Sequence, residues 1–326
     1  MRRLSHTTLL DIEARRICLI KPSAFGDVVQ TLPFLSVLRQ RFPRAEIHWV
    51  INRELATLIE GHPQLDRIIP FERRGGFFAW RELVHHLWGC RFDLVFDLQG
   101  LARTGLMTVA TGAPVRVGLE TAREGSSLTC NVIVPGTSRE VPAHARYLPV
   151  ARALGITNPG TSLLPVSPSD EAWAASVLQS LPRPVVAVHA GARWSTKQWP
   201  VERFATSIEP VLNQRGGSVI ALGSGSEAAS AGRLCELLAA RLSANRIRNL
   251  AGQTTLKQLV ALLGRVDLTV SNDSGPMHLA AAVGSPLVGI FTCTDPLRSG
   301  PPPSSRSLMV ATEVACAGTY HKVCPL

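Results

Sequence analysis

Short apolar runs alternate with amphipathic segments along almost the whole chain, and this alternation limits the possible folds more than any other feature of the sequence. RRICLIK at 15–21 and PVVAVHA at 184–190, for example, have the pattern of buried strands, and a helical pattern follows each of them. Parallel strands need a crossover between them, usually a helix, and such crossovers are right-handed. The order therefore predicts βαβ units and an α/β fold with doubly wound parallel sheets.

The same pattern assigns ranges to the expected elements. Strands are expected at 15–21, 45–51, 65–71, 92–98, 114–120, 184–190, 217–223, 246–252, 266–272 and 286–291. Helices are expected at 27–41, 54–60, 79–88, 101–111, 143–154, 201–214, 227–240 and 256–263, and once more after residue 272.

A chain of 326 residues is longer than one hydrophobic core usually supports, so two domains are expected. The stretch at 157–170 is rich in Pro, Ser, Thr and Gly and is the best linker candidate. We therefore expect Rossmann-like domains at 1–160 and 161–326, facing each other across a central cleft. Ligands of such sheets bind beyond the carboxyl ends of the strands, so the loops after residues 21, 190, 223 and 272 are the places to search.

The net charge of +10 suits anionic partners, although arginine that merely keeps the protein soluble explains it equally well. The basic residues are mostly dispersed, so no nucleic-acid-binding arm is expected. No apolar run reaches 18 residues, and the start of the chain lacks the apolar core of a secretory signal. Seven cysteines, an odd number, favour reduced thiols over a disulfide framework. These features favour a cytoplasmic protein.

The first candidate loop is KPSAFGDVVQTLP, which follows the first strand. Gly26 permits a tight strand-to-helix turn, and Asp27 begins the expected helix, where a carboxylate is favoured. A plain helix cap explains Asp27 well. The functional alternative is a general base that acts on an acceptor hydroxyl.

The second loop, HAGARWSTKQWP at 189–200, combines small residues with one lysine. Gly191 and Ala192 allow close backbone approach, and Lys197 with Thr196 lies just before a proline that starts a helix. This composition suits a diphosphate, although the loop lacks the GK[ST] of a Walker motif. A polar loop with a solvated lysine is the equally good alternative.

The third loop, ALGSGSEAAS at 221–230, approaches a dinucleotide fingerprint but has Ala228 where the third glycine belongs. Hydride transfer is therefore weakly supported. Glu227 can accept a hydrogen bond from a ribose hydroxyl, or it can serve only as a carboxylate at a helix start.

The fourth loop is SNDSGPMH at 271–278, where more residues favour an N-cap than one helix needs: Ser271, Asn272, Asp273 and Ser274. The first helical turn then holds Gly275, Pro276, Met277 and His278. Free amides at a helix start form a ready phosphate site, and His278 can add a donor. A structural cap and a structural histidine are the alternatives.

No metal site is expected. The sequence contains no D-x-D pair that could clamp a metal-bound diphosphate, and His85 and His86 are adjacent and cannot share a helix face. Cys316 and Cys324 give only a weak zinc pattern. We predict neither a metal nor a cofactor.

Three blocks of the chain resemble the heptosyltransferases of lipopolysaccharide core assembly, glycosyltransferase family 9. They are ICLIKPSAFGDVVQTLP, HAGARWSTKQWP and the block from LAGQTTLKQ to SNDSGPMHLAAAVGSPLVGIF. They occur in the family's order and span roughly 15–325. The resemblance implies a GT-B fold and metal-independent, inverting transfer from ADP-heptose. It also implies an anionic glycolipid acceptor of the lipid A-core type and peripheral contact with the inner membrane face.

The resemblance also implies roles for residues. Asp27 would be the general base, and Lys197 would neutralise the diphosphate. Donor binding would involve Gly191, Ala192, Thr196, Glu227, Asp273, Ser274, Gly275, Pro276, Met277 and His278. Candidates for acceptor binding are Arg73, Arg74, Arg103 and Arg116, although surface solubility explains each of them singly somewhat better.

The tail departs from the family pattern. Thr319 stands where the family often has a cysteine in CAGTYHKVCP, and the family's closing helix is expected to be missing or short. A GT-B nucleotide-sugar epimerase and a non-catalytic nucleotide- or glycan-binding relative are the alternative functions.

Overall fold

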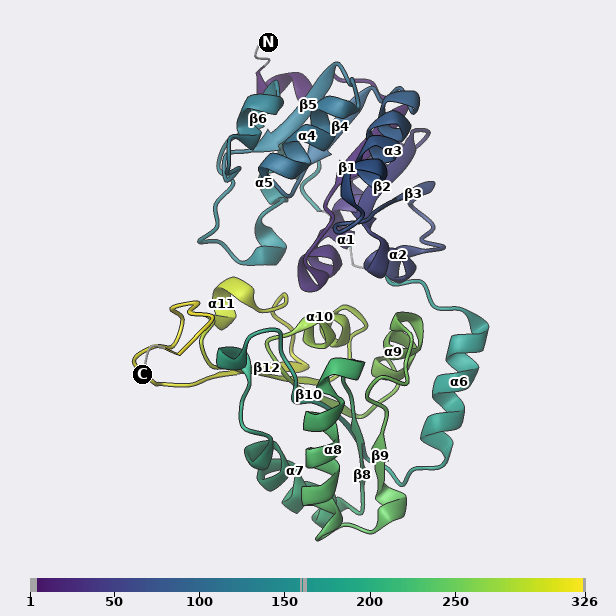
Figure 1. Cartoon of the computed structure of the whole chain (residues 1–326), viewed down its shortest axis with the longest axis vertical. Helices are drawn as coiled ribbons and strands as arrows, with labels where there is room; N and C mark the ends of the chain where they lie inside the picture. Colours follow the sequence, from purple (N-terminus) through teal and green to yellow (C-terminus); the bar gives the residue numbers. More distant parts are fainter. Residues whose placement is uncertain (1–4, 159, 161–162, 325–326) are drawn as a thin grey trace. The chain divides into compact units, whose positions relative to one another are not determined.

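The computed structural model describes residues 5–158, 160 and 163–324 (Figure 1). The chain forms two compact units, Met1–Pro165 and Val166–Leu326. Each unit is built on one six-stranded parallel sheet. This confirms the predicted α/β class with doubly wound sheets.

The first sheet has the strand order β3-β2-β1-β4-β5-β6. Its strands are β1 (Arg16–Ile20), β2 (Glu46–Asn52), β3 (Arg67–Phe71), β4 (Leu94–Asp97), β5 (Val115–Leu119) and β6 (Val132–Val134). The central strands are almost entirely buried on both faces, as expected of a sheet with helices on both sides.

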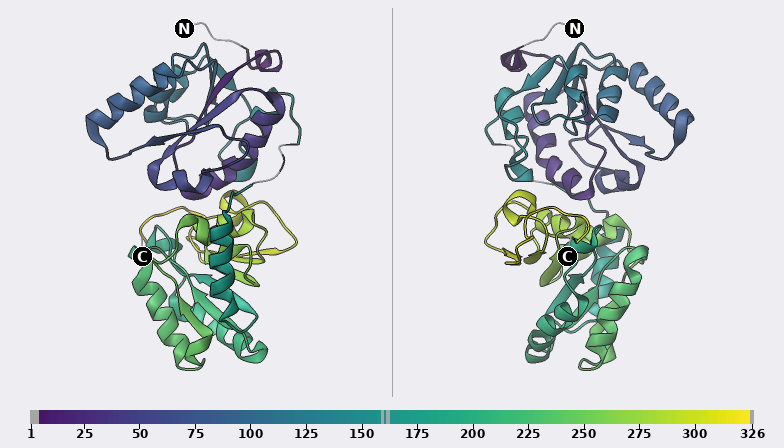
Figure 2. Two further views of the ribbon diagram at one scale, coloured as in Figure 1. Left: turned by 90° about the vertical axis from the view of Figure 1, so that its right-hand side faces the viewer. Right: turned by 60° about the vertical axis from the view of Figure 1, so that its left-hand side comes forward.

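Helices cover both faces of the first sheet: α1 (Phe25–Arg41), α2 (Arg53–Ile59), α3 (Gly76–Gly89), α4 (Ala102–Ala110) and α5 (Leu148–Ala153). Leu83 and Leu87 of α3 share one core cluster with Met107 of α4 and with inward residues of β1 to β4. Phe34 of α1 packs edge-on against Phe96 of β4, with ring centroids 5.4 Å apart. Figure 2 shows the layers from two further sides.

The second sheet has the order β12-β11-β10-β7-β8-β9. Its strands are β7 (Val185–His189), β8 (Ser218–Ala221), β9 (Ile247–Asn249), β10 (Leu268–Asn272), β11 (Leu287–Phe291) and β12 (Ser307–Ala311). Its helices are α6 (Pro168–Gln179), α7 (Val201–Arg215), α8 (Ala228–Ala239), α9 (Leu256–Leu263), α10 (Gly275–Ala282) and α11 (Pro296–Ser299). Short 3₁₀ turns lie at His6–Leu10, Ser126–Thr129, Ala143–Ala145, Ser195–Lys197, Gly225–Glu227 and Ala244–Arg246.

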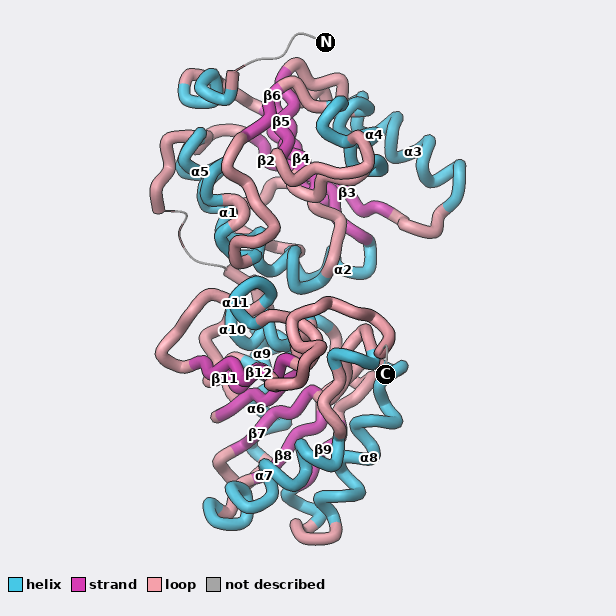
Figure 3. The backbone as a smooth tube through the Cα atoms, turned by 90° about the vertical axis from the view of Figure 1, so that its left-hand side faces the viewer, coloured by secondary structure: helices cyan, strands magenta, loops and turns pink. Residues whose placement is uncertain are grey.

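Both sheets share one topology, which Figure 3 displays as strands between helices. The first strand of each sheet pairs with both its second and its fourth strand, so β1 lies between β2 and β4 and β7 lies between β8 and β10. The strand order reverses at this point, and loops that leave the carboxyl ends of two such strands diverge and form a crevice. The switch points are therefore β1/β4 in the first unit and β7/β10 in the second.

Some predicted boundaries were wrong. The range 143–154 is not one helix but a 3₁₀ turn followed by α5, and the predicted linker 157–170 ends inside α6. The Ser167 side chain accepts a hydrogen bond from the Asp170 amide, so residues with a linker composition are the cap of α6. Residues 159, 161 and 162 of the linker lie outside the described part. The strands β6 and β12 and the helices α6 and α11 were not predicted.

No helix in the described part of the chain is long and apolar enough to cross a membrane.

Candidate functional site

The loops that follow β7 and β10 are joined by buried side chains at the switch point of the second sheet. The Asn272 Nδ2 donates to the Ala190 carbonyl at 2.7 Å, and the Asn272 Oδ1 accepts from the Trp199 amide at 3.1 Å. The Ser274 Oγ lies 3.0 Å from the His189 Nδ1. His189 at the end of β7, Asn272 at the end of β10 and Ser274 at the N-cap of α10 thus fix the loop between β7 and α7 against the start of α10.

Lys197 and Asp273 form an ion pair in this region, with the Lys197 Nζ 2.6 Å from the Asp273 Oδ2. The Asp273 side chain is 4% exposed and the Lys197 side chain 18%. The Thr294 Oγ1 also donates to the Asp273 Oδ2, at 2.6 Å, and the His278 Nε2 lies 4.0 Å from the Asp273 Oδ1. The structure therefore brings three predicted site residues together around one buried carboxylate.

The start of α10 lacks a side-chain cap from the described residues, although Ser274 occupies the N-cap position. The Ser271 Oγ donates to the Asn272 carbonyl at 2.8 Å and lies 3.1 Å from the Ser274 Oγ. All four cap-type side chains at 271–274 therefore bond elsewhere in the loop network. Helix N-termini carry partial positive charge, so this start is electrostatically suited to an anion.

Two residues of the first α10 turn have side chains that face the core. The Met277 side chain is fully buried, and a Cβ at Gly289 would meet its sulfur at 2.9 Å. His278 is also buried, beside Asp273. A ligand at this helix start can therefore meet the Met277 backbone but not its side chain.

Gly191 makes room for Glu227. A Cβ at Gly191 would lie 2.1 Å from the Glu227 Oε1, so any larger residue would displace that carboxylate. The Glu227 Oε2 accepts from the Ser224 amide and hydroxyl, both at 2.8 Å, and lies 3.4 Å from the His189 Nε2. The hydrogen bond with His189 holds the pKa of Glu227 at about 2. Glu227 therefore serves as a carboxylate at a helix start, and its contact with a ribose hydroxyl stays a prediction.

The other two predicted residues of the loop after β7 serve its internal structure. Ala192 is buried, and its carbonyl accepts from the Gln198 Nε2 at 2.8 Å. The Thr196 Oγ1 donates to the His321 carbonyl at 2.6 Å, which ties the loop to the C-terminal segment.

Asp27 lies in the first unit, at the carboxyl end of β1. The helix α1 begins at Phe25, so Asp27 is its third residue rather than its first, and the prediction was two residues late. The Asp27 Oδ2 accepts from the Ala24 amide at 3.2 Å and lies 3.6 Å from the Nζ of the buried Lys21. Burial alone would lower the pKa of Lys21, but Asp27 and Tyr147 outweigh it and the pKa is raised. An ammonium thus faces the Asp27 carboxylate.

The sequence prediction missed Asp97, which ends β4 beside β1 and is almost fully buried. Its Oδ1 accepts from the amides of Gln99 and Gly100, and its Oδ2 accepts from the hydroxyls of Thr104 and Ser126. Burial raises the pKa of Asp97 in spite of these donors. An aspartate between an apolar strand and Gln-Gly is a signal that could have found it. It positions the loop that leads to α4.

Three of the four predicted acceptor arginines follow carboxyl ends of strands in the first sheet. Arg73 and Arg74 are exposed in the turn between β3 and α3. Arg103, in the first turn of α4, lies with its Cζ 5.8 Å from the centre of the Phe71 ring. Arg116 is near the amino end of β5 instead, where its Nε donates to the Thr129 carbonyl at 2.9 Å. The structure gives Arg116 a role in holding the β5–β6 edge.

Neither Cys316 and Cys324 nor a surface cavity of the first unit lies among the predicted donor residues. Cys316 and Cys324 are free thiols, and within the described residues no three His, Cys, Asp or Glu side chains are placed to hold a metal. A cavity of about 450 Å³ opens instead at the amino ends of β1 to β3, lined by Arg16, Glu46, His48, Arg67, His85, His86, Gly89 and Cys90.

Comparison with known proteins gives consistent likenesses. The model of glycosyltransferase family 9 (heptosyltransferase) matches residues 80–326. The lipopolysaccharide core heptosyltransferase OpsX of Haemophilus influenzae is 26% identical, over 88% of this chain and 82% of the relative. The structure of ADP-heptose LPS heptosyltransferase II from E. coli matches with a TM-score of 0.76 and 27% identity, over 93% of this chain and 92% of that chain. E. coli heptosyltransferase WaaC with ADP-2-deoxy-2-fluoro heptose matches with a TM-score of 0.68 and 25% identity, over 90% and 92%. The predicted GT-B type of fold is confirmed.

Proposed function

The chain belongs to glycosyltransferase family 9, and from this premise we propose that it transfers a heptose from ADP-heptose to an acceptor of the lipopolysaccharide-core type. The likeness to a heptosyltransferase solved with an ADP-heptose analogue supports the donor. The observation that carries the proposal is the start of α10, uncapped by described side chains, beside Lys197. A nucleoside diphosphate is the kind of anion that such a site suits.

In this proposal the donor diphosphate binds at the amides of Gly275, Met277 and His278, with Ser274 and Pro276 shaping the turn. Lys197 turns from Asp273 toward the phosphate oxygens, and the hydroxyl of Thr294 stays on the carboxylate. Negative charge that develops on the departing ADP is met by Lys197 and the helix start, with no metal ion required.

Glu227 is proposed to accept from a ribose hydroxyl. Its low pKa, about 2, keeps the carboxylate ionised and therefore an acceptor at neutral pH. Gly191 leaves the space that Glu227 occupies, so the loop after β7 and the loop after β8 act together.

Asp27 is proposed as the general base of an inverting transfer. It takes the proton of the acceptor hydroxyl while that oxygen bonds to the anomeric carbon. The bond from the anomeric carbon to the diphosphate oxygen breaks, and its electron pair leaves with ADP. The buried Lys21 ammonium, 3.6 Å away, favours the ionised carboxylate that this role needs.

The first unit is proposed to take the acceptor and the second the nucleotide sugar. Arg73, Arg74 and Arg103 suit an anionic lipid-linked glycan because guanidinium groups pair with phosphate in a bidentate manner. Such an acceptor implies work at the inner face of the cytoplasmic membrane.

The test is incubation with ADP-heptose and a lipid A-core acceptor, with ADP release and product mass as readouts. Asp27→Asn should keep the rise in Tm that ADP causes but lose about 10²–10⁴-fold in turnover. The matched control is Glu54→Gln, an exposed carboxylate in the first turn of α2, which should change neither.

Three results would contradict the proposal. Turnover by Asp27→Asn at the wild-type rate removes Asp27 as the base. Conversion of the donor in the absence of any acceptor indicates an epimerase. Nucleotide binding without turnover of any nucleotide sugar indicates a non-catalytic relative.

A further inference from the structure

Two large aromatic side chains at the start of α3 are exposed to solvent. Phe77 is 72% exposed and Phe78 is 76% exposed. Their rings contact each other edge-on, with centroids 5.9 Å apart. A phenylalanine pair left in water forgoes the burial that such side chains usually gain, so this pair suggests a partner.

The rest of α3 continues this exposed side. Leu83 and Leu87 face the core of the unit. At about 100° per residue, Phe77, Arg81 and Trp88 fall within about 40° of one another, and their centre lies about 120° around the helix from that of Leu83 and Leu87. Trp88 is 66% exposed. The outer side of α3 therefore carries aromatic rings at both ends and an arginine between them.

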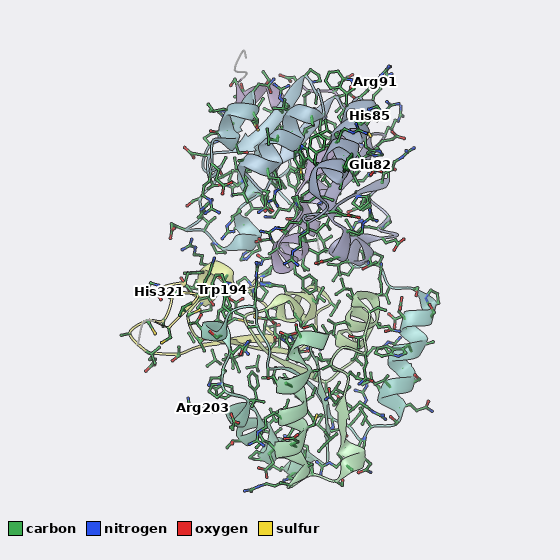
Figure 4. All side chains as sticks on the ribbon, in the orientation of Figure 1. Glu82, His85, Arg91, Trp194, Arg203 and His321 are labelled. Carbon is green, nitrogen blue, oxygen red and sulfur yellow. The ribbon has the colours of Figure 1, made fainter. Side chains whose placement is uncertain are left out.

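The charge around this side is mostly positive. Arg73 and Arg74 in the preceding turn and Arg81 on the helix are exposed. Of the nearby carboxylates, Glu72 is paired with Arg53, whose Nε lies 2.6 Å from the Glu72 Oε1. Glu82 is the acidic residue on the helix, and Figure 4 labels it with His85 along the outer side of α3.

We propose that this aromatic and basic surface docks the enzyme on a bilayer that contains anionic phospholipids. We name it the α3 face: Arg73, Arg74, Phe77, Phe78, Arg81 and Trp88. Aromatic side chains and arginine stems suit the headgroup boundary of a bilayer, and each basic residue near an anionic surface adds about fivefold to partitioning. A protein partner would need a complementary acidic and apolar surface, whereas a bilayer supplies both properties at once.

The position of the α3 face agrees with the proposed function, on which this inference rests. The helix α3 follows β3, and Asp27 follows β1, in the same parallel sheet. The start of α3 therefore lies at the same edge of the sheet as the proposed base. A lipid-linked acceptor held in a bilayer must reach that edge.

The test is co-sedimentation of the whole protein, without nucleotide, with vesicles of phosphatidylcholine alone or with about one third phosphatidylglycerol. Wild type should bind the anionic vesicles at least tenfold more tightly, and the difference should shrink in high salt. The double variant Phe77→Ser/Phe78→Ser should weaken binding to the anionic vesicles at least tenfold, and Arg81→Gln about fivefold. The control is Leu297→Ser, which changes an equally exposed apolar residue of the second unit and should leave binding unchanged. Thermal melts verify that each variant is folded.

Wild-type binding by the folded double variant would overturn the inference, and so would equal binding to neutral and anionic vesicles. Loss of a dimer in the double variant, with vesicle binding unchanged, would assign the α3 face to a second copy and overturn it too.

Transfer to a water-soluble, deacylated acceptor separates this inference from the proposed function. The double variant should keep wild-type turnover on that acceptor and lose it on the vesicle-held form. Vesicle binding as predicted, with no transfer by wild type on either acceptor, would remove the proposed function and leave the α3 face in place. Transfer by wild type, with full vesicle binding by the double variant, would remove only the α3 face.

Discussion

Replacing Lys197 by Met should destabilise the second unit by about 3 kcal/mol, because the variant leaves the Asp273 carboxylate buried without its cation. Removal of one partner from a buried ion pair costs about 3–5 kcal/mol. The lower end applies here because the Thr294 hydroxyl still donates to Asp273 at 2.6 Å and because Lys197 is itself 18% exposed. Met keeps the apolar stem of the side chain beside Trp194, over whose ring the Lys197 Nζ lies at 5.0 Å.

A double-mutant cycle isolates the pair. Asp273→Asn alone leaves a lysine without its carboxylate and should also destabilise, by less, since Lys197 can reach solvent. The double variant carries two neutral groups, so its free energy of unfolding should fall by less than the sum of the two single losses. The difference is the coupling energy, which should be about 1.5–3 kcal/mol. Urea unfolding followed by tryptophan fluorescence measures the free energy of unfolding of each variant. Trp194 and Trp199 flank Lys197 in the sequence.

In thermal melts the Lys197→Met loss corresponds to roughly 6–12 °C for a unit of this size. Single variants that each cost under about 0.5 kcal/mol, with effects that simply add, would refute the reasoning, because the pair would then not be formed in solution. ADP adds a second readout. If Lys197 meets the diphosphate, the rise in Tm with ADP should shrink in Lys197→Met and persist in a control such as Arg215→Met, an exposed cation at the carboxyl end of α7.

Gly191→Ala should displace the Glu227 carboxylate, cost about 1–3 kcal/mol in urea unfolding and weaken ADP binding; a variant as stable as wild type would contradict the 2.1 Å approach. The pKa of Glu227 falls from an ordinary 4.5 to about 2, so its stabilisation is fully present above pH 4.5 and is lost as the pH falls through 2. In melts between pH 5 and 2, Glu227→Gln should therefore lose less stability than wild type, and parallel curves would argue against the shift. Asp97→Ala should lower the free energy of unfolding by about 3 kcal/mol, because it leaves buried hydrogen-bond donors without an acceptor. Urea unfolding measures this loss, and the exposed control Asp11→Ala should lose less than about 0.5 kcal/mol.

Local signals explain where the sequence predicted the fold well. The predicted helix at 256–263 has the same bounds as α9. The structure shows a capping box at its start, in which the Thr255 hydroxyl accepts from the Gln258 amide and the Gln258 side chain accepts from the Thr255 amide. A capping box involves only residues that are close together in the sequence. β6 has only three residues, too few to show a period, and β12 is an edge strand with partly exposed residues, so neither gave a clear pattern.

The sequence likewise predicted one part of the candidate site, its loops, and not the other, the contacts between its side chains. The loops after β1, β7, β8 and β10 were predicted, because parallel strands with crossover helices bring their carboxyl ends to one edge. The partners inside the site were not predicted: Lys197 and Asp273 are 76 residues apart in sequence, and Asp97 and Ser126 are 29 apart. Contacts at such separations depend on the packing of the whole unit, and no local period encodes them.

The number of cap-type residues before α10 does not show whether any of them caps the helix, because in the structure their side chains bond elsewhere. Had any of them capped the helix, its amides would be satisfied within the protein and a ligand would have to displace that cap. Instead Asn272 holds the loop after β7, Ser274 contacts His189, and Asp273 pairs with Lys197. The same residues that give up capping therefore fix the only lysine of the loop beside the helix start. If an anion draws Lys197 away from Asp273, the carboxylate keeps the Thr294 hydroxyl and stays near His278, which reduces the cost of losing its cation.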